Sequence, residues 1–315
     1  MDRYPLMAIL GPTAVGKTEL SLKIAEQING EIISADSMQI YRNMDIGTAK
    51  ASQFDRKQIK HHLIDIVNPD QDFSVADYQE RVDALIPKIV KRGNIPILVG
   101  GTGLYIKAII QGFLFPEMET NNELRSKLEK EAEKYGNEYV HNKLEEIDIE
   151  LANKLHPNDL RRVIRGIEVY NETGNTITYY KKKQEATPMR YNALKIGLTR
   201  EREMLYKRIN QRIDIMIENG LINEVENLLD SGYDIGMTAL QGLGYKEIVG
   251  YLNNEYSLDE AVRILKRDTR HFAKRQITWF NRDNDINWFN LSQRNTEPVF
   301  NEIMNLIKKW SKTSA

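Results

Sequence analysis

A glycine-rich motif close to the amino end constrains the fold of this chain more than any other feature. The motif consists of Gly11, Pro12, Thr13, Ala14, Val15, Gly16, Lys17 and Thr18. It matches the phosphate-binding loop (P-loop) pattern G-x-x-x-x-G-K-[ST], between an apolar run at residues 6–10 and a helical pattern from Lys17 to about Asn29. There, loop N–H groups and a helix N-terminus attract an anion. We predict a di- or triphosphate site, in which Lys17 reaches phosphate oxygens and the Thr18 hydroxyl binds Mg²⁺.

Strands and helices alternate after this motif. Residues 31–35 and 95–99 are short, mostly apolar runs of the kind that forms buried strands. Between them, a helix is expected to begin after Ser74, with Asp77 placed to complete a capping box. This alternation predicts an α/β fold, with a P-loop parallel-sheet core flanked by helices.

A mainly helical domain is expected to interrupt this core at residues 116–190. Residues 117–150 hold eleven acidic and five basic side chains, whereas residues 161–212 hold thirteen basic and five acidic ones. The core would then comprise residues 1–115 and 191–315, and its last part would return as helices. Because the chain as a whole has a net charge of -1, this local segregation of charge favours a face that binds a polyanion.

The composition excludes several classes of protein. The 315 residues include no Cys, which excludes disulfides, thiolate catalysis, Cys-ligated zinc and iron–sulfur clusters. No apolar run reaches the length of about 18 residues that suggests a membrane span, and the apolar run at the amino end leads into the P-loop instead of a signal-peptide cleavage site. We therefore expect a cytoplasmic protein without membrane contact, and a monomer.

The second predicted strand ends at a carboxylate, Asp36. The third ends in the glycine-rich loop 100–103, which has no acidic residue and has Thr102 as its single polar side chain. Many P-loop NTPases hold Mg²⁺ with an acidic residue at a strand end. Since parallel strands present their carboxyl ends at one edge, where open α/β sheets bind ligands, Asp36 and Thr102 should lie near the P-loop. Asp36 could be a metal ligand, a general base or a turn cap.

Two further segments suit a nucleic acid but also have ordinary interpretations. Residues 241–246 combine an amide, two glycines, an aromatic ring and a cation, which suit a splayed-out base or a simple turn. A capping box at residues 257–260 predicts a long helix. Its basic residues recur at steps of four, three and four and would form one stripe or a solvated face: Arg263, Arg267, Arg270 and Lys274.

Several blocks, in order along nearly the whole chain, resemble the tRNA dimethylallyltransferase (isopentenyltransferase) family. They are residues 11–18, 36–41 (DSMQIY), 46–50 (IGTAK), 61–65 (HHLID), 99–105 (VGGTGLY) and 270–276 (RHFAKRQ). One departure is Ala51, where many members have Pro. The chain also lacks the zinc-finger extension of eukaryotic members, so it resembles the bacterial type.

The resemblance implies transfer of a dimethylallyl group from dimethylallyl diphosphate to N6 of adenosine 37, beside the tRNA anticodon. The P-loop would hold the diphosphate leaving group in place of ATP, with Mg²⁺ on Thr18 and with Lys17 stabilising the charge that develops. Asp36 would accept the N6 proton as the nitrogen attacks, and Thr102 would assist. The target nucleotide must leave its stack, at a cost of a few kcal/mol, to enter such a pocket.

The resemblance also implies the tRNA contacts, partly within the inserted domain. They are Asp36, Ser37, Met38, Gln39, Thr102, Arg125, Asp159, Leu160, Arg161, Arg162, Val163, Gln241, Gly242, Leu243, Gly244, Tyr245 and Lys246. Arg161 and Arg165 would hold phosphates of the anticodon stem. Arg208 and Arg212, one helical turn apart, could serve the diphosphate or the RNA, and the sequence does not decide between them.

Three other interpretations account for part of the pattern. A small-molecule kinase would explain the P-loop, although the carboxylate follows the second strand and not the third. An adenylate isopentenyltransferase would use the same donor with free AMP, but it would need neither the insertion nor long basic segments. A non-catalytic RNA- or GTP-binding module would not need Asp36 and Thr102 beside the P-loop.

Overall fold

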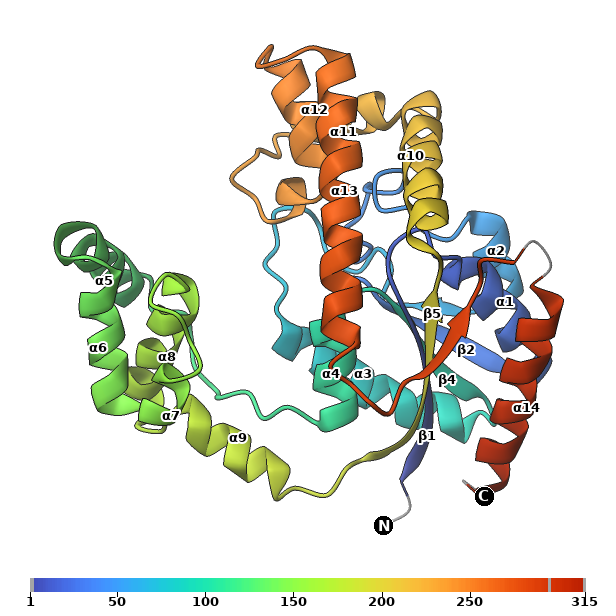
Figure 1. The fold of residues 1–315 in the computed structure, drawn as a ribbon, viewed down its shortest axis with the longest axis horizontal. Helices are drawn as coiled ribbons and strands as arrows, with labels where there is room; N and C mark the ends of the chain where they lie inside the picture. Colours follow the sequence, from blue (N-terminus) through green and yellow to red (C-terminus); the bar gives the residue numbers. More distant parts are fainter. Residues whose placement is uncertain (1–2, 294–295, 314–315) are drawn as a thin grey trace. The chain divides into compact units, whose positions relative to one another are not determined.

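The computed structural model describes residues 3–293 and 296–313 and separates the chain into two compact units (Figure 1). The first, here called the sheet unit, comprises Met1–Ile110 and Arg190–Ala315. The second, the helical unit, comprises Gln111–Met189, where the charge pattern predicts an insertion at 116–190. Among the described residues, none of the helices combines the length and apolar character needed to span a bilayer.

The sheet unit is built on one parallel sheet, which confirms the predicted fold class. Its described strands are β1 (Tyr4–Leu10), β2 (Gly30–Ala35), β3 (His61–His62), β4 (Ile95–Gly100), β5 (Tyr191–Thr199) and β6 (Asn287–Asn290). They lie in the order β3-β2-β4-β1-β5-β6, and every neighbouring pair is parallel. The expectation that the last part of the chain returns only as helices is wrong, because β5 and β6 extend the sheet beside β1.

Helices cover both faces of this sheet. They are α1 (Lys17–Ile28), α2 (Gln53–Gln58), α3 (Val75–Lys91), α4 (Gly103–Gln111), α10 (Arg202–Glu218), α11 (Leu221–Asp230), η1 (Ala239–Gln241), α12 (Tyr245–Leu252), α13 (Leu258–Phe280) and α14 (Glu297–Thr313). Side chains of β1 alternate between two cores. Met7 and Ile9 pack with α1, α10 and α13, whereas Leu6 and Ala8 pack with α3 and α4. Burial on both faces explains why β1 is apolar throughout.

Local signals define the ends of the predicted helices. Ser74 and Asp77 form the expected capping box at the start of α3. Asn29 ends α1 in the left-handed conformation, with φ of 55°. At the start of α13, the Ser257 hydroxyl accepts from the Glu260 N–H at 3.3 Å, but the Glu260 carboxylate pairs with Arg263 instead of completing a box. The predicted box at residues 257–260 is therefore half formed.

A buried carboxylate secures the edge of the sheet. Glu31 on β2 accepts hydrogen bonds from Arg92, Asn94 and His62 at 2.6–2.9 Å. Burial alone would raise the pKa of Glu31, but the bonds from Arg92, His62 and Asn94 outweigh it and lower this pKa to about 2. The carboxylate therefore stays charged and joins β2, β3 and the end of α3 at the amino edge of the sheet.

The helical unit has its own apolar core. Its helices are α5 (Asn122–Tyr135), α6 (Asn137–Ile147), α7 (Ile149–Ala152), α8 (Leu160–Thr173) and α9 (Ile177–Glu185). Val140 and Leu144 of α6 pack against Val163 and Ile167 of α8. Gly166 allows this approach, since a Cβ there would lie 2.6 Å from a Leu144 methyl carbon. The unit thus buries enough apolar surface to form a separate core.

Candidate functional site: the carboxyl edge of the sheet

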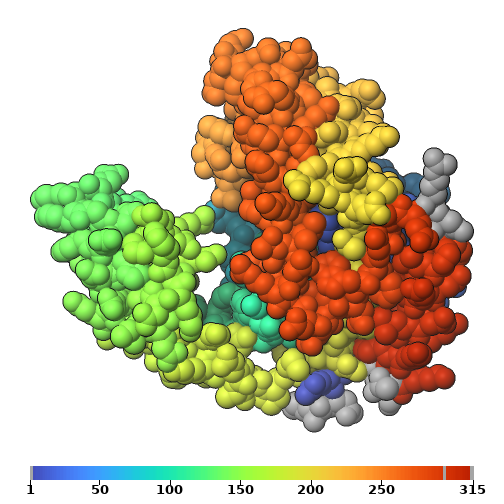
Figure 2. Space-filling view, in the orientation of Figure 1, coloured from blue at the N-terminus to red at the C-terminus, as the bar shows by residue number. Residues whose placement is uncertain are grey.

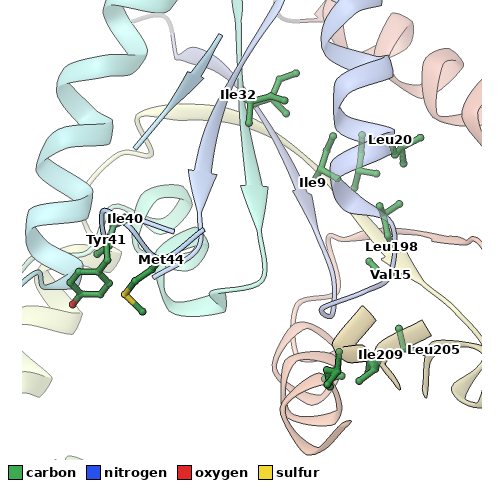
Figure 3. Close-up of a cluster of buried hydrophobic side chains, with 14 of the residues drawn as sticks. Ile9, Val15, Leu20, Ile32, Ile40, Tyr41, Met44, Leu198, Leu205 and Ile209 are labelled. Atoms are coloured by element: carbon green, nitrogen blue, oxygen red, sulfur yellow. The ribbon is translucent and has the colours of Figure 1, made fainter. Parts of the chain in front are cut away.

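The P-loop follows β1, a central strand, and wraps the N-terminus of α1. Gly11 has φ of 149°, and a Cβ there would lie 2.5 Å from the Leu198 carbonyl oxygen, so a larger residue would displace β5. Val15 is buried and points toward Leu198, Leu205 and Ile209 (Figure 3). The Val15 side chain therefore anchors the loop in the core, and only the backbone of this residue is available for a phosphate.

Lys17 lies inside the loop that it is predicted to serve. Its ammonium group donates hydrogen bonds to the carbonyl oxygens of Gly11 and Pro12, each at 2.9 Å. Burial and the charge of Arg212 lower the pKa of Lys17 to about 7, while Asp36 opposes the shift. A buried ammonium group next to another cation would gain from an anionic ligand, as a diphosphate site requires.

Three arginines lie near this loop, and two of them donate hydrogen bonds to its carbonyl groups. Arg208 donates through Nε to the Ala14 carbonyl at 2.9 Å, and Arg200 donates to the Val15 carbonyl at 2.8 Å. Burial lowers the pKa of Arg212, the charge of Asp36 opposes this change, and Arg208 adds to it. Arg208 therefore binds the P-loop backbone, and Arg212 is near enough to Lys17 and Asp36 for their charges to interact.

Asp36 and Thr102 meet at the edge where β2 and β4 end. The Thr102 N–H donates to the Ala35 carbonyl at 3.1 Å, and the Thr102 hydroxyl accepts from the Ser37 N–H at 3.1 Å. The Asp36 carboxylate accepts from the Met38 N–H at 2.9 Å, which fixes its orientation. Because the charge of Asp36 also reaches Lys17, the edge combines two glycine loops, cations and one carboxylate.

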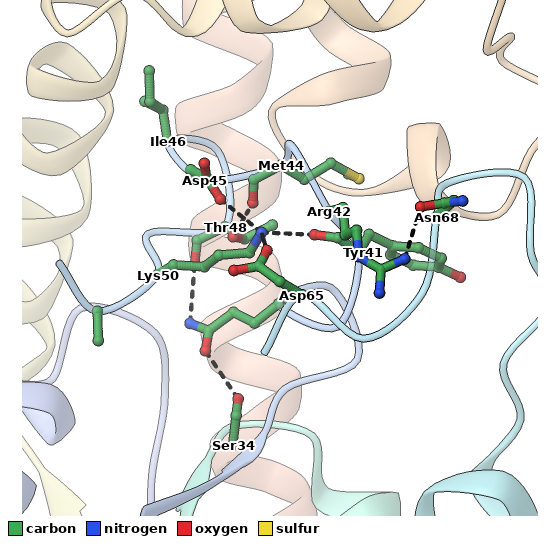
Figure 4. Close-up of polar contacts among 12 residues, drawn as sticks. Ser34, Tyr41, Arg42, Met44, Asp45, Ile46, Thr48, Lys50, Asp65 and Asn68 are labelled. Atoms are coloured by element: carbon green, nitrogen blue, oxygen red, sulfur yellow. Dashed lines mark hydrogen bonds and ion pairs between the residues drawn. The ribbon is translucent and has the colours of Figure 1, made fainter. Parts of the chain in front are cut away.

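The segment after Asp36 is held by internal polar contacts (Figure 4). Gln39 accepts from the Ser34 hydroxyl at 2.9 Å and donates to the Thr48 carbonyl at 3.2 Å. Lys50, whose side chain is 1% exposed, donates to the Tyr41 carbonyl at 2.6 Å and to Asp65 at 2.5 Å. Gln39 therefore holds its own loop, and its amide is already occupied in the absence of RNA.

Glu224 on α11 is a structural partner of this segment that the sequence did not indicate. Its carboxylate accepts from three consecutive N–H groups, those of Asp45, Ile46 and Gly47, at 2.7–3.1 Å. It also accepts from the Tyr245 hydroxyl at 2.7 Å. A glutamate on an amphipathic helix resembles any surface charge in the sequence, so only the fold identifies this role.

Tyr245 is one of the predicted RNA contacts, but its side chain lies in the protein interior. Its side chain is fully buried, and a Cβ on Gly47 would lie 2.6 Å from the ring. The ring therefore packs against the chain and has no face free for a base. Gly242 packs closely against Met38. A Cβ on Gly242 would lie only 2.6 Å from the Met38 methyl carbon.

The rest of the predicted loop is divided between exposed and covered positions. Gln241 and Lys246 are exposed at its two ends, and the Gln241 amide donates to the Ile235 carbonyl. Leu243 packs against the core, and the Gly244 N–H donates to Glu247 at 2.8 Å. Gln241 and Lys246 are therefore the side chains of this loop that can reach a nucleic acid without rearrangement of the core.

Glu168 binds two predicted RNA contacts in the helical unit and balances one of their two positive charges. Arg125 donates to this fully buried carboxylate through two nitrogens, at 2.8 and 2.9 Å, and Arg165 donates to it at 2.6 Å. Val163 is fully buried in the core of the unit, so its side chain cannot contact RNA. Arg161 and Arg162 are exposed at the start of α8.

The remaining predicted contacts are two residues at the start of α8 and one residue beside Asp36. Asp159 precedes the helix and lies 3.2 Å from Arg162, and Leu160 packs partly against the core of the helical unit. Ser37 follows Asp36 and is half-buried. Two arginines, Arg161 and Arg162, therefore supply the exposed positive charge at this end of the helical unit.

The basic stripe of α13 is mostly paired within the protein. Figure 2 shows side chains of α13, in orange, at the surface beside those of α10, in yellow. Arg263 pairs with Glu260, and Arg267 pairs with Asp268 at 2.7 Å. Arg270 donates to Asn210 at 2.8 Å, whereas Lys274 is exposed. Carboxylates therefore balance two of the four charges, those of Arg263 and Arg267, whereas the partner given for Arg270 is a neutral amide.

The residues around Thr18 fit a magnesium ion only when a diphosphate supplies ligands. Among residues 3–293 and 296–313, no group of three His, Asp or Glu side chains could hold a metal. Thr18 is exposed on the first turn of α1, beside the P-loop. Mg²⁺ accepts one protein hydroxyl together with phosphate oxygens and water, so this oxygen donor set suits it.

Comparisons with known proteins decide the family. A family model described as IPP transferase matches residues 39–283, which is more than half of the chain. A tRNA dimethylallyltransferase of Halothermothrix orenii is 67% identical over 309 residues, covering 98% of this chain and 94% of that protein. The chain belongs to the IPP transferase family. The resemblance inferred from the motif blocks is thereby confirmed.

Solved structures agree with this membership of the IPP transferase family. The full-length tRNA isopentenylpyrophosphate transferase of Bacillus halodurans is 43% identical, with a TM-score of 0.75 and coverage of 99% of this chain and 98% of that one. A eukaryotic dimethylallyltransferase acting on tRNA is 29% identical, with a TM-score of 0.80 and coverage of 92% and 74%. Both resemble this IPP transferase over nearly its whole length.

Proposed function

We propose that this IPP transferase moves a dimethylallyl group from dimethylallyl diphosphate to N6 of adenosine 37 in the anticodon loop of tRNA. The observation that carries the proposal is that two cations and one carboxylate lie close together at one edge of the sheet. The charges of Arg212 and Asp36 both act on the pKa of Lys17, and the charge of Asp36 also acts on the pKa of Arg212. Two cations suit a departing diphosphate, and a carboxylate suits the proton of an attacking amine. Relatives named tRNA dimethylallyltransferase support the same reaction.

On the donor side, the P-loop binds the diphosphate. Lys17, Arg208 and Arg212 together with the N–H groups at the start of α1 stabilise the negative charge that grows as the allylic C–O bond breaks. The bonding electrons of that C–O bond leave with the diphosphate. Mg²⁺, bound through Thr18, would neutralise further charge on the leaving group. An allylic carbon disperses positive charge, so departure can precede full bond formation.

On the acceptor side, the N6 nitrogen forms the new C–N bond and loses one proton to Asp36. The Met38 N–H holds one oxygen of the Asp36 carboxylate, and in this proposal the other oxygen accepts the proton. Thr102 fixes the adjoining backbone by accepting from Ser37. General base assistance of this kind contributes about 10²–10⁴ in rate. The products are N6-dimethylallyl adenosine in the RNA and free diphosphate.

The RNA contacts in this proposal are the predicted positions that the fold leaves exposed. They are Gln241 and Lys246 in the sheet unit, and Arg161 and Arg162 in the helical unit. All the groups named come from one chain, so a cytoplasmic monomer that binds one tRNA is sufficient. The cost of extracting adenosine 37 from its stack, a few kcal/mol, is offset by contacts to the flipped base and to the flanking phosphates.

A comparison of two group donors distinguishes this proposal from the kinase interpretation. Purified protein is incubated with Mg²⁺, an anticodon stem-loop that contains adenosine 37, and either labelled dimethylallyl diphosphate or γ-labelled ATP. We expect label from the first donor in the RNA, with one diphosphate released per transfer, and no phosphate transfer from ATP. Consumption of ATP without prenylated RNA would replace the proposal with the kinase interpretation.

A further inference from the structure

We propose that Gln276 on α13 is a positioning residue that holds the P-loop and the Thr102 loop at the separation needed for prenyl transfer. This inference rests on the proposed function. The Thr13 N–H donates to the Gln276 side-chain oxygen at 2.9 Å, and the Gln276 side-chain nitrogen donates to the Gly101 carbonyl at 3.0 Å. One side chain thus joins the loop for the leaving group to the loop beside the base.

The two contacts require an amide. Thr13 presents an N–H group and Gly101 presents a carbonyl, so the bridging side chain must accept at one end and donate at the other. Gln276 is only 7% exposed, and a Cβ on Gly101 would lie 2.2 Å from its nitrogen. Water therefore has little access to replace either bond, and losing one leaves a buried polar group unpaired.

The helix that carries Gln276 provides a rigid base for the bridge. α13 runs for 23 residues, and Ala273 and Phe280 are buried on the same side as Gln276. Ala273 belongs to the core on one face of the sheet, whereas Phe280 belongs to the core on the other face. The position of Gln276 is therefore defined by both apolar cores, and not by the mobile ends of a loop.

From Gly101, the connection continues to the residue beside Asp36. The next residue, Thr102, donates to the Ala35 carbonyl and accepts from the Ser37 N–H, each at 3.1 Å. A continuous path of hydrogen bonds and peptide units thus leads from Thr13 to the backbone on both sides of Asp36. A displacement of about 1 Å at a reacting centre can cost about 100-fold in rate.

The bridge has a consequence for donor binding. Because the Thr13 N–H is directed to Gln276, it is not among the groups that hold the diphosphate in this arrangement. Removing the bridge would free this donor for phosphate. We therefore expect donor affinity to be preserved or slightly improved when the bridge is lost, while the rate of transfer falls.

The first test uses Gln276→Met, which keeps the length of the side chain but forms neither bond. Single-turnover transfer is measured with saturating donor and stem-loop RNA, together with the Kd of each substrate and the melting temperature. We expect the rate constant to fall about 10- to 100-fold, with each Kd within threefold of the wild-type value. A normal rate constant, or a loss confined to the Kd values, would overturn the proposal.

Leu265→Ala is the matched control for stability. Leu265 lies on the same helix, is 2% exposed and belongs to the apolar core, and its side chain has no polar atom that could bridge the two loops. This variant should melt at least as early as Gln276→Met but transfer the prenyl group within twofold of the wild-type rate at a temperature where both are folded. An equal rate loss in Leu265→Ala would mean that Gln276 acts only through general stability.

The second test measures whether protonation of the new carboxylate restores the transfer rate of Gln276→Glu. In Gln276→Glu, an ionised carboxylate cannot donate to Gly101, whereas a protonated one can replace both amide bonds. The ratio of the variant rate to the wild-type rate should therefore rise toward one between pH 8 and pH 5.5, because the pH dependence of the reaction itself affects both proteins alike. A pH-independent ratio would contradict the positioning role. Absence of transfer by the wild-type protein would instead contradict the proposed function.

Discussion

Substitution of Asp36 should lower the rate of the chemical step while leaving tRNA binding nearly unchanged. Asp36→Ala should lower the rate constant of transfer by about 10²–10⁴, because the N6 proton loses its acceptor, while the tRNA Kd changes only a few-fold. Single-turnover kinetics and a binding isotherm measure the two quantities. Asp70→Ala, at an exposed carboxylate, is the control and should be unaffected. A near-normal rate constant in Asp36→Ala would remove the general-base role.

The lowered pKa of Lys17 predicts that donor affinity depends on pH. Its pKa is lowered to about 7 in the free protein, and a bound diphosphate favours the protonated form. Binding should therefore take up protons, and donor affinity should fall about 10- to 50-fold from pH 7 to pH 9 as the free ammonium group loses its proton. The phosphate stays ionised in this range, since its second pKa is about 6.

Calorimetry in two buffers with different ionisation enthalpies measures this proton uptake directly. In Lys17→Met the donor should bind more weakly, and the dependence on pH should disappear. An equally steep dependence in that variant would assign the proton to another group.

Single residues could be predicted where a local motif determines their position. The P-loop residues, Asp36 and Thr102 come at strand ends, and parallel strands bring their ends together. Tyr245 and Val163 could not be assigned in this way, because tertiary packing decides whether a side chain faces the core. Gln276 belonged to a recognisable block, but its partners Thr13 and Gly101 are distant in the chain, so no local pattern indicates the bridge.

At the scale of elements, α11 holds the segment after β2 through one carboxylate. Glu224→Ala should leave three N–H groups of residues 45–47 without their acceptor and loosen that segment. We expect a loss of about 1–3 kcal/mol in unfolding free energy and at least a tenfold lower rate of transfer. Denaturant unfolding and single-turnover assays measure these changes. Glu226→Ala, exposed on the same helix, should match the wild-type protein in both.

Strands with continuous apolar runs were predictable, and the others were not. β1, β2 and β4 lie in the interior of the sheet and are mostly apolar, as burial on both faces requires. β3 is two histidines long, and β5 carries Asn192 and Lys195 among its apolar residues. Lys195 pairs with Asp283 at 2.7 Å, a long-range contact that accounts for a charge in a strand. Such partners are not visible in the local sequence.

At the scale of the whole molecule, tRNA affinity should depend steeply on salt. Contacts from exposed cations to phosphates release counterions, so the affinity should fall about 10- to 100-fold between 50 and 200 mM salt. Arg161→Ala with Arg162→Ala should reduce the slope of log affinity against log salt by about one for each lost contact. Lys130→Ala on α5, a helix with four acidic and four basic residues, is the control. A flat salt dependence would remove the polyanion-binding argument.

The charge pattern predicts an insertion at residues 116–190 but not which of its cations are paired. Most of this range lies in the helical unit, Gln111–Met189. Charge counts cannot show that Glu168 pairs with Arg125 and Arg165 and balances one of their two charges, because its pairing with Arg125 spans 43 residues of sequence. The exposed charge that remains is smaller than the composition suggests.

The choice of acceptor distinguishes prenylation of tRNA from the other reactions that this fold could support. Label from dimethylallyl diphosphate is followed with Mg²⁺ into three acceptors in parallel: an anticodon stem-loop with adenosine 37, the same RNA with guanosine 37, and free AMP. We expect incorporation only into the first, at a rate that Asp36→Ala lowers by about 10²–10⁴. Incorporation into AMP, or equal incorporation into both RNAs, would contradict the claim that this edge of the sheet prenylates adenosine 37 of tRNA.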